Sequence, residues 1–334
     1  MPPPALQVDF WDVGYGDATV IWLDTSRVIL IDSGPENSPV PLWLEKHGIR
    51  VDLAIFTHND GDHLGGFMKL VELRGRQVGP YALLEDRPPD GLQRAWKELM
   101  IRRERGELSD PIRIDPRRGE PQDLLAAAGL PPHPYRGIIE LKAIYPAMFD
   151  QINAPRRRPN DHSAIIVLWF HEQPRVAWPG DLPLGTCQRE LENNSIRPTF
   201  LVGPHHGGPT DVPALRPQDV QCLIQRIGHT QSWISVAWHG GRKHPLPGYL
   251  QPVCQMGVEV RCSQLTVRCD DEPDRFGRGL YPSHDWLGLE RPPRGTSCMG
   301  PMRVKFLPTT HQIQFLDEHK AARKKVTRPL CNAP

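Results

Sequence analysis

A short polar segment directly after an apolar run constrains the fold of this chain more than any other feature. The run Val-Asp-Leu-Ala-Ile-Phe at residues 51–56 predicts a buried strand. The segment after it, residues 57–66, places two imidazoles and two carboxylates within six positions: His58, Asp60, Asp62 and His63. A helix would scatter these side chains around its axis, whereas a loop can turn all of them toward one point. We therefore expect a strand whose end carries a polar site.

The composition of this polar cluster indicates a metal site. Two imidazoles and two carboxylates crowded together are unfavourable unless a cation compensates them. Imidazole plus carboxylate, with no thiolate, suits a hydrolytic divalent-metal site better than a structural zinc site. The alternative is a solvated polar loop that happens to be rich in His and Asp.

The cluster also resembles the His-x-His-x-Asp-His signature of the metallo-β-lactamase fold. Asp60 stands where most of that superfamily has its second histidine. The resulting His-x-Asp-x-Asp-His-x-Gly-Gly form is similar to the subset found in the C-terminal domain of ComEC, the bacterial DNA-uptake protein.

Other segments resemble the same subset, in the family's order, across residues 6–268. Residues 10–18 (FWDVGYGDA) are similar to its "DVGQGDA" turn, and residues 28–34 (VILIDSG) to its "ILIDTG" strand. Residues 160–163 (NDHS) resemble "NxxS", and residues 179–181 (PGD) resemble "TGD". Residues 204–208 (PHHGG) and the pair of segments 234–236 (ISV) and 244–245 (HP) resemble "PHHGS" and "ISVG…HP".

The resemblance implies an α/β fold, the four-layer αββα sandwich of the metallo-β-lactamases. We expect a domain over residues 1–268, with a helical insertion at 84–135 and a C-terminal extension at 269–334 that ends in a basic tail. Apolar runs predict strands at 6–11, 18–23, 28–31, 138–144, 164–170, 175–178, 199–202, 232–237 and near 258 and 267. Helical patterns cover 41–47, 63–73, 218–226 and 247–256, amphipathic stretches cover 93–103 and 122–128, and a final hairpin is expected at 302–306 and 312–315.

The resemblance also implies the site residues. His58 and Asp60 would hold a first metal, Asp62 and His63 a second, and Asp181 would bridge them. One histidine of the pair His205 and His206 should complete the set, and the sequence does not say which. Asp62 is further expected to take up the proton of the attacking water.

Two more residues have expected roles beside the metals. Asp32 follows an apolar strand and is expected to orient a ligand imidazole, the alternative being that it caps the turn at Ser33-Gly34. His244 is expected to be catalytic or a ligand, the alternative being a histidine of a surface turn.

The segment before Ser163 supplies candidates for binding the substrate. Many family members have a histidine ligand four residues before this serine, but here the position is Pro159. Asn160 matches the ComEC subset, and His162 either faces the metals or lies on the opposite face of the strand. Guanidinium groups bind phosphate through two parallel hydrogen bonds. The triplet Arg156, Arg157 and Arg158 is therefore either a phosphate-binding element or a solvated charge run.

Bulk properties exclude several classes of protein. The formal net charge is +1, so no global basic field indicates nucleic-acid binding. No apolar run approaches the ~20 residues that span a bilayer, and the N-terminus has no secretory signal pattern. The seven cysteines are an odd number at irregular spacing, which favours reduced thiols in a cytoplasmic protein.

These observations predict a metal-dependent hydrolase, a phosphodiesterase or nuclease that acts on DNA or RNA through two divalent metal ions, Mn²⁺ or Zn²⁺. Its expected partner is nucleic acid or another phosphoester substrate, with no membrane and with any protein partner unidentified. The alternatives are a hydrolase of a small phosphoester or lactone, and a defence or regulatory protein that binds a nucleotide at this site.

Overall fold

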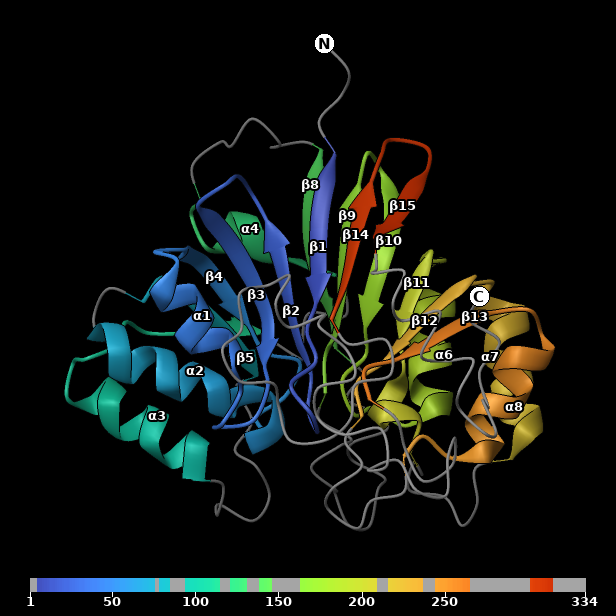
Figure 1. Cartoon of the computed structure of the whole chain (residues 1–334), viewed down its shortest axis with the longest axis horizontal. Helices are drawn as coiled ribbons and strands as arrows, with labels where there is room; N and C mark the ends of the chain where they lie inside the picture. The colour runs from blue at the N-terminus through green and yellow to red at the C-terminus, as the bar shows by residue number, and fades with distance from the viewer. Residues whose placement is uncertain are drawn as a thin grey trace.

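The computed structural model describes residues 5–75, 78–84, 94–114, 121–130, 138–145, 163–208, 216–236, 244–264 and 301–314. These residues form two β-sheets packed face to face, with helices on both outer faces (Figure 1). The layers are helix, sheet, sheet and helix, so the expected four-layer αββα sandwich is confirmed.

The first sheet has eight strands among the described residues, in the order β15-β14-β1-β2-β3-β4-β5-β6. The strands are β1 Leu6–Phe10, β2 Ala18–Trp22, β3 Arg27–Ser33, β4 Arg50–Ile55, β5 Tyr81–Leu84, β6 Ile112–Ile114, β14 Met302–Phe306 and β15 His311–Gln314. From β3 to β6 neighbouring strands are parallel, and the others are antiparallel.

The second sheet runs β13-β12-β11-β10-β9-β8-β7 over the described residues. Its strands are β7 Gln122–Asp123, β8 Ile139–Ile144, β9 Ile165–Phe170, β10 Gln173–Trp178, β11 Phe200–Val202, β12 Gln231–Ile234 and β13 Glu259–Cys262. Neighbours from β10 to β13 are parallel. Each sheet therefore has a parallel half, and loops at the carboxyl ends of parallel strands are where α/β sheets carry their sites.

Helices cover the outer face of each sheet (Figure 1). On the first sheet these are α1 Val40–Lys46, α2 Gly61–Arg74 and α3 Arg94–Glu104. On the second they are α6 Leu184–Asn193, α7 Pro217–Ile227 and α8 Pro247–Gln255, and a short helix, α4 Leu124–Ala127, contacts β8. No helix in this described part of the chain is long and apolar enough to cross a membrane.

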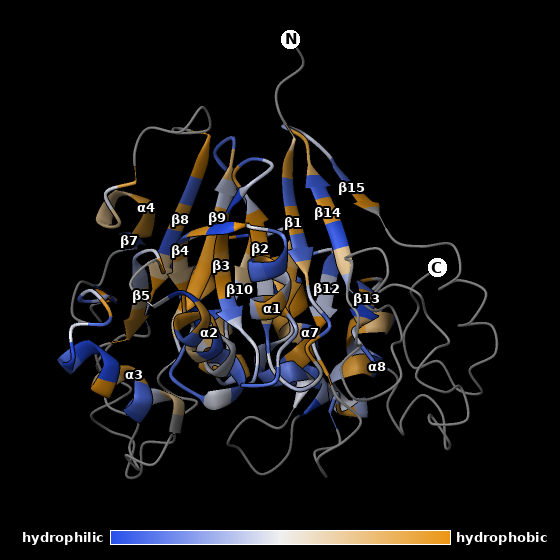
Figure 2. Cartoon of the chain, turned by 60° about the vertical axis from the view of Figure 1, so that its left-hand side comes forward, coloured by the Kyte–Doolittle hydropathy of each residue, from blue (hydrophilic) through white to orange (hydrophobic). Residues whose placement is uncertain are grey.

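Strands buried on both faces explain the continuous apolar runs of the sequence. In β3, Ile29 and Ile31 face the core between the sheets, while Val28 and Leu30 face the core under α1 and α2. β9 repeats this pattern: Ile166 and Leu168 join the central core, and its alternate residues pack under the helices of the second sheet. Hydrophobic residues accordingly gather along the central strands, whereas α3 presents many hydrophilic ones (Figure 2).

The structure adds elements that the patterns did not predict. The segment expected as a helical insertion contains α3 and α4, but it also supplies β6 to the first sheet and β7 to the second. Helix α6 was not predicted either. The expected final hairpin is present as β14 and β15, and β14 pairs with β1 in the first sheet. The basic tail and the expected strand near residue 267 lie outside the described residues.

Candidate metal centre

The polar cluster of the sequence lies where loops of both sheets meet. His58, Asp60 and the first turn of α2 follow β4 of the first sheet, and Asp181 follows β10 of the second. A 3-10 turn, Pro204–Gly207, follows β11 and carries His205 and His206. The site is therefore shared by the two sheets.

A hydrogen-bond network fixes the imidazole of His63. The Asp32 carboxylate, at the end of β3, accepts hydrogen bonds from the Thr57 backbone N–H and hydroxyl, both at 2.8 Å. His63 Nδ1 lies 2.8 Å from Asp32 Oδ2. A carboxylate only accepts hydrogen bonds, so Nδ1 carries the proton and Nε2 presents its lone pair. This geometry is compatible with the expected role of Asp32 in orienting an imidazole, which remains a prediction.

His58 is fixed in the same way from the other side of Thr57. Its Nδ1 lies 3.1 Å from Thr57 Oγ1, whose proton is already donated to Asp32. Nδ1 of His58 therefore donates to this oxygen, and Nε2 is left to bind a cation.

The Asp181 carboxylate lies between four imidazoles of the described residues. Its Oδ1 is 3.5 Å from His63 Nε2 and 3.6 Å from His206 Nε2. Its Oδ2 is 3.8 Å from His58 Nε2 and 3.6 Å from His205 Nε2. Each carboxylate oxygen thus faces its own pair of imidazoles. The sequence predicted one inward-facing histidine from residues 205 and 206, and the structure turns both rings toward Asp181.

Several of these atoms are buried without a hydrogen-bond partner among the described residues. They are His58 Nε2, His63 Nε2, both ring nitrogens of His206 and Asp181 Oδ1. Leaving a buried polar atom unpaired costs free energy, and buried polar groups are almost always satisfied in native proteins. Divalent cations bound by these atoms would remove that cost, so the residues present fit a metal site.

Burial and crowding shift the pKa values in the site. Burial alone would raise the pKa of Asp181, but His63, His58 and His206 outweigh it and hold that pKa well below its usual range. Burial would lower the pKa of His63, but Asp32 and Asp181 raise it well above its usual value. Burial raises the pKa of Asp62; His63 opposes this shift and Asp181 reinforces it. Burial lowers the pKa of His206 to about 3.

The Asp62 carboxylate groups with His58 and Asp60. The ligand atoms of these three residues lie within 4.8 Å of one another, and His58 Nε2 is 3.8 Å from Asp60 Oδ2. The resemblance pairs Asp62 with His63 instead. The Asp60 side chain is 22% exposed, whereas that of His58 is 2% exposed, so the cluster is reached from the Asp60 side.

Three of the six non-glycine residues with a positive φ in the described part of the chain lie at the site. Asp32, His205 and His206 have φ values of 50°, 49° and 53°, in the left-handed region that non-glycine residues rarely adopt. Such conformations persist only where the surrounding structure enforces them, and they cluster at functional sites. In the 3-10 turn, the two consecutive left-handed residues are His205 and His206 themselves, and both rings face Asp181.

His244 lies at the rim of the cluster. It is buried, and its ring centroid is 5.5 Å from that of His205 and 6.3 Å from that of Tyr15. Asn160, His162 and the triplet Arg156, Arg157 and Arg158 lie outside the described residues, so their expected roles remain predictions.

The sequence reasoning gave no role to Asp17, which the structure brings into the centre. Asp17 is buried, and its carboxylate groups with His63 and His206, the ligand atoms lying within 4.8 Å of one another. Burial raises its pKa to about 8, an effect that His63 opposes and Asp32 reinforces. The available signal was its place in the "DVGQGDA"-like segment, immediately before β2.

Comparisons with known proteins agree with this architecture. The model of the metallo-beta-lactamase superfamily matches residues 11–143. The chain has the metallo-β-lactamase fold. A comparison with curated protein sequences finds no significant match. The match is at the level of the superfamily, and the finer likeness to ComEC remains a prediction.

Solved structures give weaker similarities. The metallo-β-lactamase fold protein YhfI from Bacillus subtilis aligns with a TM-score of 0.45 at 12% identity, covering 77% of this chain and 95% of that one. The metallo hydrolase Igni18 from Ignicoccus hospitalis gives 0.42 at 11% identity, with 77% and 94% covered. Human tRNase Z, short form, gives 0.42 at 14% identity, with 69% and 92% covered. Similarity at this level does not distinguish between substrates.

Proposed function

We propose that the protein is a metal-dependent phosphodiesterase that cleaves DNA or RNA. The observation that carries the proposal is the placement of Asp181, whose two oxygens each face a separate pair of imidazoles. Each oxygen of Asp181, together with the pair of imidazoles that it faces, would contribute to holding one of two cations. His58, His205 and Asp60 would hold one ion, and His63 and His206 the other.

Two divalent ions at such a site supply Lewis-acid stabilisation of both the entering and the leaving oxygen of a phosphoester, and lower the pKa of water. The residues of this chain do the rest. Asp32 and Thr57 hold the imidazoles of His63 and His58 in place. A carboxylate oxygen of Asp62, whose pKa is raised by burial, accepts the proton of the attacking water. His244, at the rim, would assist the leaving group.

Two features favour a nucleic-acid substrate over other esters. The donor set combines carboxylates with imidazoles, and carboxylate oxygens suit the hard ions used in phosphoryl chemistry. The sequence also resembles a family whose context is DNA uptake, and an arginine triplet precedes its "NxxS" segment. The fold itself hosts several hydrolytic reactions and does not decide between them.

The test is hydrolysis by chelator-stripped protein reloaded with Mn²⁺ or Zn²⁺, assayed on single- and double-stranded DNA and RNA. Bis(p-nitrophenyl) phosphate and a lactone serve as small-molecule comparisons. We expect cleavage of nucleic acid that depends on added metal. Cleavage of the small esters alone would overturn the nuclease assignment.

Asp62→Asn and His63→Ala should each reduce hydrolysis by several orders of magnitude, because they remove a proton acceptor and a ligand at the reacting water. Asp219→Asn is the matched control, since Asp219 also lies in the first turn of a helix but is paired with Arg216 at the surface. Folded Asp62→Asn protein with a wild-type rate would contradict the proposed site.

A further inference from the structure

We infer that Asp17 is a further carboxylate ligand of the metal centre, binding the ion held by His63 and His206. The inference rests on the two-ion site of the proposed function, and does not depend on the substrate. It adds a ligand from the β1–β2 loop to a site whose expected ligands all follow β4, β10 and β11.

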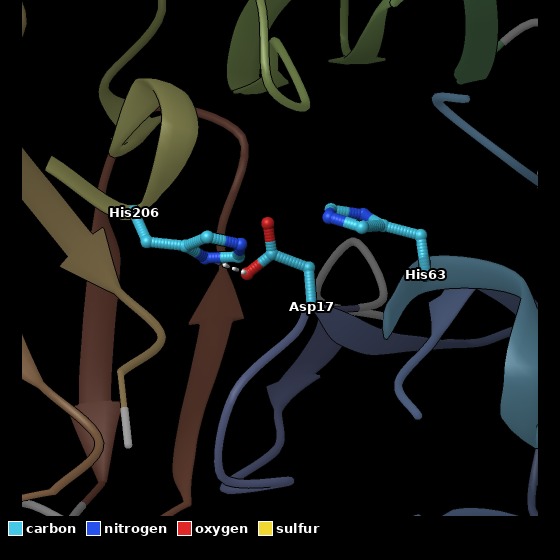
Figure 3. A group of neighbouring side chains, drawn as sticks. All are labelled: Asp17, His63 and His206. Atoms are coloured by element: carbon cyan, nitrogen blue, oxygen red, sulfur yellow. Dashed lines mark ion pairs between the residues drawn. The ribbon is translucent and has the colours of Figure 1, made fainter. Parts of the chain in front are cut away.

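The three side chains converge from distant parts of the chain (Figure 3). The Asp17 carboxylate lies between the two imidazoles, with Oδ1 3.8 Å from His206 Nδ1. The ligand atoms of the three residues lie within 4.8 Å of one another. All three side chains are buried, and His63 Nε2 and both nitrogens of His206 have no hydrogen-bond partner among the described residues. These imidazole nitrogens and the Asp17 carboxylate therefore lie in one buried space.

Its distance to the nearest imidazole distinguishes Asp17 from Asp32, which orients a histidine through a hydrogen bond. Asp32 is hydrogen-bonded to His63 at 2.8 Å, whereas Asp17 and His206 are 3.8 Å apart, too far for a hydrogen bond. Asp181, the expected bridging ligand, keeps similar distances of 3.5–3.8 Å to its imidazoles. Ligands bound tetrahedrally to one ion at ~2.0–2.2 Å are kept apart by the ion, so their atoms lie beyond hydrogen-bonding contact. Asp17, like Asp181, thus keeps a distance to an imidazole nitrogen that is longer than a hydrogen bond, with Asp17 facing Nδ1 of His206 and Asp181 facing its Nε2.

The β1–β2 loop is anchored so that Asp17 stays at the site. The Asp17 carbonyl oxygen accepts a hydrogen bond of 2.7 Å from the Gly34 N–H, and the Ser235 hydroxyl donates to the Gly16 carbonyl oxygen. Gly16 has a φ of 122°, and a Cβ there would overlap the Asp62 carbonyl oxygen. The Tyr15 ring lies against His206, with 4.9 Å between centroids. The loop is thus packed directly onto the segments that carry the other ligands.

With Asp17 as a ligand, each of the two metal positions has a carboxylate of its own. Asp62 groups with His58 and Asp60, so the position at His63 and His206 has Asp17 as its own carboxylate, besides the shared Asp181. Without a cation, burial raises the pKa of Asp17, an effect that His63 opposes and that the carboxylates of Asp32, Asp181 and Asp62 reinforce. A divalent ion compensates these like charges.

The experiment measures metal binding rather than catalysis. Chelator-stripped wild-type protein and Asp17→Asn are titrated with Mn²⁺ by calorimetry, and bound metal is counted by elemental analysis. Asparagine keeps the size of the side chain and an acceptor oxygen but removes the charge. We expect two ions per wild-type chain, and in the variant one ion, or a second ion bound at least tenfold more weakly. Asp12→Asn is the control, because Asp12 is a buried carboxylate of the same loop that accepts hydrogen bonds from Gly14 and Gln264 instead.

Two ions bound by Asp17→Asn with wild-type affinity would overturn the inference, as would a wild-type protein that binds fewer than two. Because the variant removes a buried charge, its metal-free thermal midpoint should not fall below that of the wild type, and its rise with Mn²⁺ should be smaller. If Asp17→Asn does not fold, the size-matched pair Asp17→Glu and Asp17→Gln replaces it: only the glutamate should retain the second ion, and equal binding by both contradicts the assignment. Wild-type protein that binds two ions but cleaves no nucleic acid would refute the proposed function and leave Asp17 as a ligand.

Discussion

In the proposed site, Asp60 would give the first metal position an oxygen donor where the resembling fold usually has a histidine. Its carboxylate lies 3.8 Å from His58 Nε2 and is the more exposed of the two side chains. Oxygen-rich sites favour manganese or magnesium, whereas a borderline ion such as zinc favours nitrogen. With Asp60, Asp62 and Asp181 beside the imidazoles, we expect the highest activity with manganese, even where zinc binds more tightly.

Asp60→His should therefore shift the metal preference toward zinc. The ratio of manganese- to zinc-supported activity should fall by at least tenfold, because an imidazole replaces the hard donor. The measurement is a titration of chelator-stripped wild type and variant with each ion. An unchanged ratio would show that Asp60 does not bind metal, and wild-type activity with zinc alone would contradict the argument from ligand hardness.

Residue identity predicted much of the site, because motifs carry ligand types in a fixed order. The cluster at residues 58–63, together with Asp181, His205 and His206, was assigned from such segments. Asp17 was not assigned a role, because its place in the "DVGQGDA"-like segment does not show that its carboxylate meets His63 and His206 in the folded chain. The inward direction of both His205 and His206 depends on backbone φ values that the sequence does not show.

Helix α2 is the element that holds the metal loop against the first sheet. Gly65 and Gly66, next to the ligands, allow this helix to approach the end of β3, where a Cβ on Gly66 would overlap the Ser33 carbonyl oxygen. The Ser33 hydroxyl donates to the His63 carbonyl oxygen and accepts from the Phe67 N–H, both at 2.8 Å. The close approach thus fixes the backbone that carries His63.

Gly66→Ala should destabilise the protein by about 3 kcal/mol or more, because the added methyl group has no space against the backbone. Gly185→Ala is the matched control, since Gly185 also lies in a helix and a Cβ there meets nothing within 4 Å. That substitution should be neutral or stabilising, by up to about 1 kcal/mol. Chemical unfolding of both variants provides the measurement, and similar free energies of unfolding would contradict the packing argument.

The junction between α7 and β12 carries a histidine that is unrelated to the metal site. His229 is buried, its ring nitrogens have no hydrogen-bond partner among the described residues, and burial lowers its pKa to about 4. The unfolded chain takes up a proton near the ordinary pKa of 6.5, whereas the folded chain resists until about 4. The folded state is therefore destabilised as the pH falls through this interval.

His229→Leu removes this dependence. Relative to wild type, its free energy of unfolding should rise by about 2 kcal/mol between pH 8 and pH 5, because only the wild-type unfolded state gains a proton at this position. The difference at pH 8 reports packing alone and serves as the reference. Parallel curves of stability against pH for the two proteins would refute the expectation.

Sequence periodicity located most helices and strands, but it missed those that form only through contacts with other elements of the fold. β6 spans only Ile112–Ile114 and becomes a strand because it pairs with β5. α6 begins after Pro183 without an N-cap hydrogen bond or an acidic first turn, so the usual start signals are absent. In both cases tertiary contacts, which no local pattern shows, determine the element.

At the scale of the whole molecule, strands that lie far apart in the sequence pair in one sheet. β14 pairs with β1 over residues 302–306 and 6–10, and Phe306 packs in the core between the sheets, 5.7 Å from the ring of Phe200. Local patterns predicted the hairpin but not its partner, because pairing across the length of a chain leaves no local signal.

Phe306→Ala should destabilise the protein by about 3–5 kcal/mol, since it leaves a cavity in the central core. Ile101→Ala, on the exposed face of α3 at 41% exposure, should change stability by less than about 0.5 kcal/mol. Thermal or denaturant unfolding of the two variants tests this. A Phe306→Ala protein as stable as Ile101→Ala would mean that the hairpin is not part of the folding unit.

The wide spacing of the metal-binding residues along the chain has a consequence for how the protein acquires its ions. Residues 58–63 lie together before folding, as do the adjacent pair His205 and His206, whereas Asp17 and Asp181 join them only when both sheets have formed. We therefore expect the unfolded chain to be a poor chelator and the ions to bind after folding. Ions that bind only the folded protein stabilise it against unfolding. They therefore lengthen the lifetime of the native state without speeding its formation.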